Sequence, residues 1–134
     1  MKYIIIILAL LLVLVSGTYV CSEVCCIRCS HEEIIIEPIF ASLSATNFTE
    51  KLNEDVILID IRTPEEFFNG HIEGAININF YENFIDNINA LDKEKKYLIY
   101  CNSGRRTGLA LKQFEEQGFN EVYDLKDGIN SLIN

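Results

Sequence analysis

Two short apolar runs constrain the fold of this chain more than any other feature. They read V-I-L-I-D at residues 56–60 and Y-L-I-Y-C at residues 97–101, and the first turns polar only at its C-terminal end. Such runs suit strands that are covered on both faces, as the strands of parallel sheets are. The C-terminal end of a parallel strand is where α/β proteins usually place their sites, so the position of Cys101 is of interest.

Helix signals separate these runs. Ser44 can cap a helix that extends to Leu52. The sequence T-P-E-E at residues 63–66 combines a capping residue, a proline at the first helical position and two acids in the first turn. Residues 80–88 and 107–117 carry apolar side chains at helical spacing. The chain therefore contains at least four candidate helices.

Further apolar runs predict strands at residues 34–36, 75–78 and 122–125, and a last helical turn at residues 128–133. Strands that alternate with helices along a chain are typical of an α/β fold. We therefore predict an α/β fold with a largely parallel sheet.

The composition indicates one domain and excludes one class of partner. The chain has 134 residues, with 20 acidic against 11 basic side chains and a formal net charge of −9. A nucleic-acid-binding protein needs a basic face, so we expect no nucleic-acid partner. A local positive patch on such an acidic chain is informative for the same reason.

Residues 1–20 form an apolar leader. Lys2 precedes the apolar stretch of residues 3–15, and small residues follow it. This order is typical of a secretory signal, whereas a run that extends through Val20 reaches the lower length limit of a membrane anchor. A lipoprotein signal at Cys21 is a third interpretation. The signal and the anchor each predict export to the cell envelope, periplasmic or on the outer face of the membrane, and retention would add membrane association through the N-terminus.

The next segment, residues 21–37, is rich in cysteine. Its four thiols belong to Cys21, Cys25, Cys26 and Cys29. They can be incidental thiols of a tether, can form disulfides between neighbours outside the cell, or can be acylated beside a membrane segment. Tetrahedral zinc usually takes two well-separated ligand pairs, and no second pair follows downstream. We therefore interpret the segment as a linker and expect no metal site.

The sequence C-N-S-G-R-R at residues 101–106 concentrates positive charge beside one thiol. It follows a predicted buried strand and precedes a predicted helix, so its backbone N–H groups can form an anion nest at a helix N-terminus. Gly104 permits a tight curl, and Arg105 and Arg106 add charge. These features favour the thiolate of Cys101. The alternative is a buried thiol ahead of an ordinary helix cap.

Four stretches together resemble a single-domain rhodanese. They read V-I-L-I-D-I-R-T-P-E-E-F, G-H-I-E-G-A-I-N-I, Y-L-I-Y-C-N-S-G-R-R-T-G-L-A and G-F-N-E-V-Y-D-L-K-D-G, in the family's order and spacing. The resemblance implies a five-stranded parallel sheet flanked by helices, and a sulfurtransferase without metal or organic cofactor. We accordingly divide the chain into a leader (1–20), a linker (21–37) and a rhodanese-like domain (38–134).

The resemblance also implies a site. Cys101 would accept a sulfane sulfur from thiosulfate or a persulfide donor, and would pass it to cyanide or to a thiol, including a thiol of a partner protein. Arg105 or Arg106 would attract the anionic donor. The backbone N–H groups that would cradle the persulfide belong to Asn102, Ser103, Gly104, Arg105 and Arg106.

Other matching residues have two interpretations. Asp60 and Arg62 can line the pocket, or they can form structural ion pairs, for instance Arg62 with Glu66. We interpret His71 as structural. The family usually carries a Gly-Gly pair and then a tryptophan near the C-terminus. Here Asp127-Gly128 replaces the pair and Leu132 takes the tryptophan position, which weakens the expected C-terminal packing.

Two rival functions remain open. A phosphatase or arsenate reductase on the same fold needs a Cys-x5-Arg loop so that an arginine clamps a tetrahedral oxyanion. Counting from Cys101 places Thr107 at that position, and Arg106 comes one residue early. The second rival is a persulfide carrier or redox module without turnover, whose upstream thiols exchange with Cys101.

Overall fold

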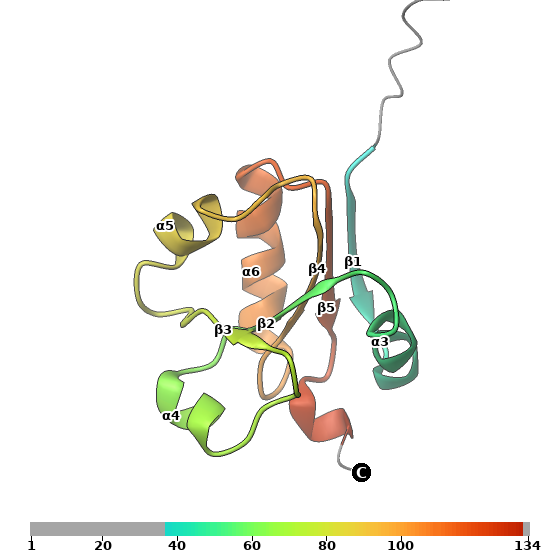
Figure 1. Cartoon of the computed structure of the whole chain (residues 1–134), viewed down its shortest axis with the longest axis vertical. Coiled ribbons are helices and arrows are strands. Elements are labelled where there is room, and N and C mark those ends of the chain that lie inside the picture. Colours follow the sequence, from blue (N-terminus) through green and yellow to red (C-terminus); the bar gives the residue numbers. More distant parts are fainter. Residues whose placement is uncertain (1–36, 133–134) are drawn as a thin grey trace, which may run out of the picture. The chain divides into compact units, whose positions relative to one another are not determined.

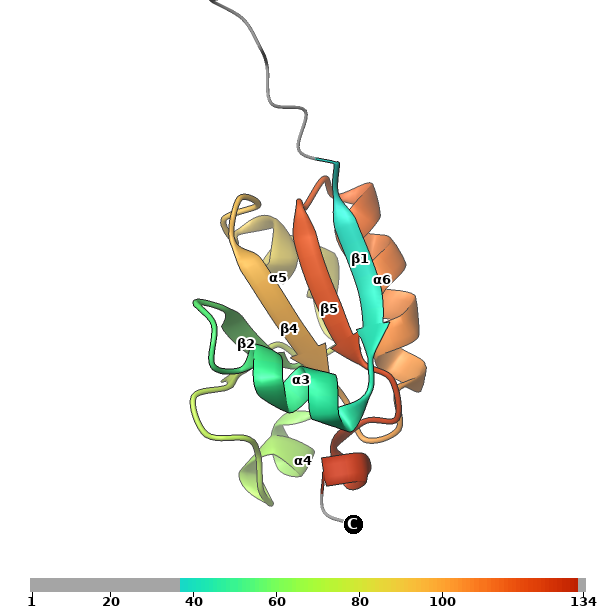
Figure 2. The ribbon, with the colours of Figure 1, turned by 90° about the vertical axis from the view of Figure 1, so that its right-hand side faces the viewer.

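The computed structural model describes residues 37–132, which form a five-stranded parallel sheet with helices on both faces (Figures 1 and 2). The strand order is β1-β5-β4-β2-β3, and every hydrogen-bonded pair of strands is parallel. The strands are β1 (Ile39–Leu43), β2 (Ile57–Asp60), β3 (Ile76–Asn77), β4 (Lys96–Tyr100) and β5 (Glu121–Leu125). The predicted α/β class is confirmed, as is the five-stranded sheet that the resemblance implied.

Helices cover the sheet on both sides. Figure 2 shows α3 in front of the sheet, with α5 and α6 behind it. The helices are α3 (Ala45–Lys51), α4 (Pro64–Phe68), α5 (Phe84–Asn89), α6 (Arg105–Glu116) and the 3-10 helix η1 (Ile129–Leu132). The four longest helices begin or end close to the predicted positions. For α3 and α4 the reason is that Ser44 and Thr63 cap their N-termini through their side chains.

Alternate side chains of the strands pack into two apolar clusters, one on each face of the sheet. Tyr97 and Ile99 of β4 pack with Phe114 of α6, whereas Leu98 of the same strand packs with Phe48 of α3. All five side chains are fully buried. This two-sided burial explains why β4 reads as a continuous apolar run, and it places the residue after β4 at the C-terminal edge of the sheet.

One predicted element differs from the structure, and another lies outside the described residues. The strand expected at residues 34–36 belongs to the second kind, and the first described strand is β1, after Pro38. The helix expected over residues 80–88 is restricted to α5. The N–H of Phe80 instead donates to the carbonyl of Ile61 (3.2 Å), and Asn83 adopts a left-handed conformation with φ of 48°, so helix cannot extend back through that turn.

The expectations for the N-terminal segment concern residues outside the described range. They include the leader and the four upstream cysteines. Among residues 37–132, no helix is both long and apolar enough to span a bilayer. The proposed domain boundaries stay predictions.

Candidate active site

Cys101 directly follows β4 and is almost fully buried, with 1% of its surface exposed. It packs in the same apolar cluster as Ile59, Ile99 and Ala110, and it is a free thiol. Its carbonyl accepts a hydrogen bond from the N–H of Ile129 at 2.8 Å. The end of β4 is thereby tied to the start of η1.

The loop after Cys101 presents a row of free backbone donors. Within the described residues, the N–H groups of residues 102–106 donate to no protein acceptor. Gly104, with φ of 79°, turns the chain into α6 as its N-cap residue. Consecutive free N–H groups at a helix N-terminus form a concavity that favours negative charge. The geometry therefore agrees with the expected anion nest.

Two glycines let a second loop approach the first. A Cβ on Gly104 would overlap the carbonyl oxygen of Lys126, and a Cβ on Gly128 would overlap the backbone of Asn102 and Ser103. Both glycines also have positive φ. The Asp127-Gly128 departure from the family pattern therefore retains the glycine that contacts the cysteine loop.

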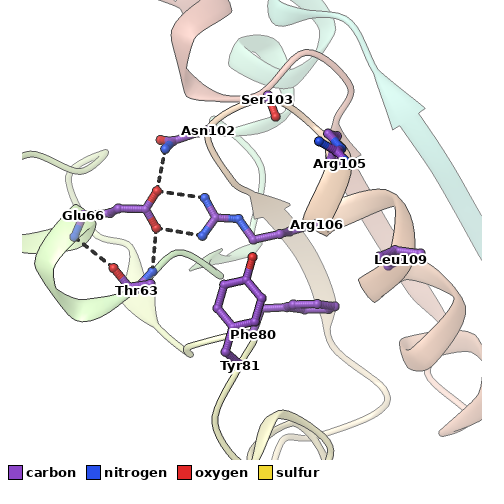
Figure 3. A pocket seen from close by; sticks show the side chains of 9 residues that line it. All are labelled: Thr63, Glu66, Phe80, Tyr81, Asn102, Ser103, Arg105, Arg106 and Leu109. Carbon is purple, nitrogen blue, oxygen red and sulfur yellow. Dashed lines mark hydrogen bonds and ion pairs between the residues drawn. The ribbon is translucent and has the colours of Figure 1, made fainter.

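A charged network fixes one side of this loop (Figure 3). Arg106 binds Glu66 through two parallel hydrogen bonds of 2.7 and 2.9 Å. Glu66 also accepts hydrogen bonds from the side-chain amide of Asn102 and the N–H of Thr63. The Arg106 hydrogen bonds, with smaller contributions from Thr63 and nearby charge, hold the pKa of Glu66 at about 2, although burial opposes this. Hydrogen bonding to Glu66 likewise raises the pKa of Arg106.

The local sequence places Glu66 in this network. Thr63 caps α4, Pro64 occupies the first turn, and Glu66 completes a capping box by accepting from the N–H of Thr63 (2.9 Å). The predicted helix start at residues 63–66 is confirmed. The same carboxylate therefore closes the start of α4 and joins α4 to the first turn of α6.

The ion pair suggested between Arg62 and Glu66 is wrong. Arg62 pairs instead with the fully buried Asp60, with 2.7 Å between Nη2 and Oδ2. Burial disfavours the charge of Arg62, but hydrogen bonds and charge from Asp60 outweigh this and raise its pKa. Arg62 also donates to the carbonyl of Gly70 and the side-chain oxygen of Asn102. Asp60 is the nearer partner because it ends the strand two residues earlier.

Two pockets flank the loop, and both are lined in part by Glu66 and Asn102. The first has a volume of about 600 Å³ and is drawn in Figure 3. Its lining consists of Thr63, Glu66, Phe80, Tyr81, Asn102, Ser103, Arg105, Arg106 and Leu109. The second, of about 580 Å³, includes Arg62 and His71. Cys101 and Asp60 line neither pocket.

Arg105 and His71 differ in their surroundings. Arg105 is exposed and has no acidic partner among the described residues. His71 stacks on Phe67, with 3.8 Å between ring centroids, and its Nδ1 lies 3.0 Å from the Phe67 carbonyl oxygen. The contacts of His71 agree with the structural interpretation.

Sequence reasoning missed the apolar side of the first pocket. Phe80 and Tyr81 were assigned to a helix, and Leu109 was not singled out. One signal for Leu109 was available: it lies four residues after Arg105, on the same face of α6. No comparable signal marks Tyr81, because its place depends on the turn that precedes α5.

The fold and the loop define an α/β domain with a buried cysteine, followed by a row of free backbone N–H groups, at the C-terminal edge of its sheet. The chain belongs to the rhodanese-like domain family, whose model matches residues 44–134. The thiosulfate sulfurtransferase GlpE of Shewanella oneidensis is 36% identical over 78 residues, which cover 58% of this chain and 76% of that protein.

Two further proteins are similar to part of this chain. A tRNA uridine(34) hydroxylase of Bdellovibrio bacteriovorus is 33% identical over 93 residues, covering 65% of this chain and 27% of that protein. A crystal structure of a rhodanese-related protein from Thermoplasma volcanium aligns with a TM-score of 0.63 and 30% identity, over 69% of this chain and 90% of that one.

Proposed function

We propose that the chain is a sulfurtransferase in which Cys101 carries the sulfur as a persulfide. The observation that carries the proposal is that this thiol directly precedes the free N–H groups of residues 102–106. Such a nest stabilises negative charge on the cysteine and on a sulfur attached to it. The relative named thiosulfate sulfurtransferase supports the same reaction class.

The proposed reaction has two steps. The Cys101 thiolate attacks the outer sulfur of thiosulfate, or of a persulfide donor. The S–S bond of the donor breaks, and its electron pair leaves with sulfite or with the donor thiolate. Cyanide or a thiol then attacks the outer sulfur of the Cys101 persulfide, which releases thiocyanate or a new persulfide and restores the thiolate. Neither step requires a metal or an organic cofactor.

The ion pairs suggest which arginine attracts the donor. Arg106 is held by Glu66 and Arg62 by Asp60, so the charge of each is largely compensated. Arg105 is exposed beside the same loop. We therefore assign donor attraction to Arg105, and assign to Arg106 the positioning of the loop.

The same contacts weigh against the oxyanion rivals. A phosphatase or arsenate reductase needs an arginine that clamps the bound anion with both guanidinium nitrogens. Here both terminal nitrogens of Arg106 bind Glu66, and position 107 is a threonine whose hydroxyl lies 2.8 Å from Asp124.

The test uses the full-length chain with thiosulfate and cyanide, and measures thiocyanate. We expect turnover in the wild type and a loss of at least about 1,000-fold in Cys101→Ser, since removal of a nucleophile costs this much or more. Cys29→Ser, which removes an upstream thiol, is the control and should keep its rate. Equal activity in Cys101→Ser would refute the proposal. A stable persulfide without thiocyanate release would favour the carrier.

We also propose that the domain acts outside the cytoplasm, because residues 1–20 have the composition of a signal or anchor. Protease added to spheroplasts, from which any outer membrane and the cell wall have been removed, should then degrade the chain, whereas a cytoplasmic marker protein should survive. Protection of the chain until the spheroplasts are lysed would contradict export.

A further inference from the structure

The first pocket carries a single uncompensated positive charge. Its charged lining residues are Arg105, Arg106 and Glu66, and Glu66 neutralises Arg106 through a bidentate ion pair. Among the charged side chains of this lining, Arg105 is therefore the one without a charged partner. A dianion such as thiosulfate would bring one more negative charge than these side chains balance, on a protein whose formal net charge is already −9. The charge of the pocket therefore suits a monoanion.

An apolar wall lines the same pocket as this charge. It consists of Phe80, Tyr81 and Leu109, and Tyr81 and Leu109 remain 68% and 57% exposed. Single exposed apolar side chains are ordinary on a protein surface, but apolar side chains that line one pocket together can mark a ligand-binding groove. The wall is therefore a candidate contact for an apolar part of the substrate.

Contacts within the site position the aromatic part of this wall (Figure 3). The Arg106 guanidinium lies 5.9 Å from the centre of the Tyr81 ring, and Phe80 packs edge-on against Tyr81 with 5.6 Å between centroids. Because Glu66 fixes Arg106, it indirectly positions Tyr81. A wall that is ordered before binding costs little entropy when a ligand contacts it.

The volume of the first pocket also favours a donor larger than thiosulfate. A pocket of about 600 Å³ lies within the range of roughly 300–1,000 Å³ that accommodates drug-sized ligands. Thiosulfate has five non-hydrogen atoms and would leave the apolar wall in contact with water. A donor with an organic body would cover it.

We propose that the sulfur donor of this protein is an organic monoanion, with an apolar body that packs on Tyr81 and Leu109 and a sulfane sulfur that reaches Cys101. The inference rests on the proposed sulfurtransferase function and deepens it. Aryl thiosulfonates and aromatic persulfides belong to this chemical class. Arg105 binds the negatively charged end of the donor.

The transfer step balances for a thiosulfonate donor. The Cys101 thiolate attacks the terminal sulfur of R–SO2–S⁻. The bond between that sulfur and the sulfonyl sulfur breaks, and the electron pair leaves on the sulfinate R–SO2⁻. Cys101 becomes the persulfide anion, so two negative charges enter and two remain. No oxidant or reductant is required.

The experiment compares three donors on the full-length chain, with cyanide as the acceptor. Benzenethiosulfonate and methanethiosulfonate share charge and reacting group and differ in their apolar body, and thiosulfate adds the second charge. We expect kcat/KM for the benzene compound to exceed that for the methane compound by about tenfold, the effect of partly burying one ring. Thiosulfate should be the poorest donor.

Three variants test which residues produce the preference for the benzene compound. Tyr81→Ser and Leu109→Ser should each reduce the benzene-to-methane ratio by about threefold or more. Phe68→Ser is the matched control, because Phe68 is 84% exposed and lies outside the first pocket. It should not change the ratio.

The outcomes separate this inference from the function on which it rests. A wild-type ratio near one, or a ratio that neither pocket variant changes, would overturn the inference while persulfide transfer itself stands. So would a higher kcat/KM for thiosulfate than for both thiosulfonates. If none of the donors places sulfur on Cys101, the proposed function fails as well.

Discussion

Gly128 lets two loops meet backbone to backbone beside Cys101. It has φ of 69°, and a Cβ there would overlap the backbone of Asn102 and Ser103. Gly104 makes the reciprocal approach to Lys126. The loop that presents the free N–H groups is therefore shaped in part by a segment more than twenty residues downstream.

Gly128→Ala should consequently destabilise the protein and distort the cysteine loop. We expect a loss of about 2–4 kcal/mol in the free energy of unfolding, from strain at positive φ together with steric overlap. Gly118→Ala is the control, since Gly118 has φ of 78° but no heavy atom within 4 Å of the added Cβ. It should cost only about 1 kcal/mol.

Denaturant titration measures both values, and persulfide formation at Cys101 reports on the loop. Equal destabilisation by the two substitutions, with unchanged persulfide formation, would mean that the contact between the loops does not shape the site.

At the scale of elements, the Glu66–Arg106 pair connects α4 to α6. The two side chains are 28% and 15% exposed, so solvent screens the pair only in part. The connection spans 40 residues of sequence. It joins the helix that contains the capping box to the helix that begins at the cysteine loop.

This pair predicts an acid-dependent loss of stability. Hydrogen bonding by Arg106 lowers the pKa of Glu66 from 4.5 to about 2 in the folded protein. A carboxyl group with a lowered folded-state pKa stabilises the protein above its unfolded-state pKa, and this contribution disappears as the pH falls from about 4.5 to 2. After solvent screening, we expect a contribution on the order of 2 kcal/mol.

Glu66→Gln isolates the effect, because glutamine keeps the side-chain length and can still close the capping box. Between pH 5 and pH 2, the free energy of unfolding should fall less steeply in the variant than in the wild type. Glu65→Gln, at an exposed neighbour on α4, is the control. Parallel pH profiles for wild type and Glu66→Gln would contradict the assignment.

At the scale of the whole domain, the sheet carries an aromatic cluster on the face covered by α5 and α6. Phe114 of α6 is fully buried and lies 4.7 Å from Phe119 and 6.1 Å from Tyr97, measured between ring centroids. Because α6 starts at the cysteine loop, packing at Phe114 sets the position of that loop against β4.

Phe114→Ala should cost about 3–5 kcal/mol, the usual effect of removing a buried aromatic ring. Phe68→Ala, which removes a ring that is 84% exposed, should change stability by no more than about 0.5 kcal/mol. Thermal and urea unfolding of both variants give the comparison. Similar effects at the two positions would show that Phe114 is not a core residue.

Much of the fold could be predicted from local signals. β2 and β4 are buried on both faces and read as apolar runs, and α4 begins with a capping box that needs only four residues. β1 could not be located in this way. Its residues I-F-A-S-L include Ala and Ser and form no continuous apolar run, and the strand forms by pairing with β5, some eighty residues away.

The same distinction between local and long-range signals applies to the site. The loop at residues 101–106 could be recognised because its signals are contiguous, whereas the partners of Arg62 and Arg106 could not be read from sequence. Each arginine had more than one acid within plausible reach, and tertiary packing decided between them. Tyr81 and Leu109 lie 28 residues apart and meet only in the folded domain, so no sequence pattern predicted the apolar wall.

A single-turnover experiment tests the central claim, that Cys101 carries the transferred sulfur. The full-length chain is mixed with one equivalent of donor, quenched, and mapped by peptide mass spectrometry. We expect one added sulfur atom on the peptide that contains Cys101, and cyanide should remove it with formation of an equal amount of thiocyanate. Sulfur found only on the upstream cysteines, or none on Cys101, would contradict the account.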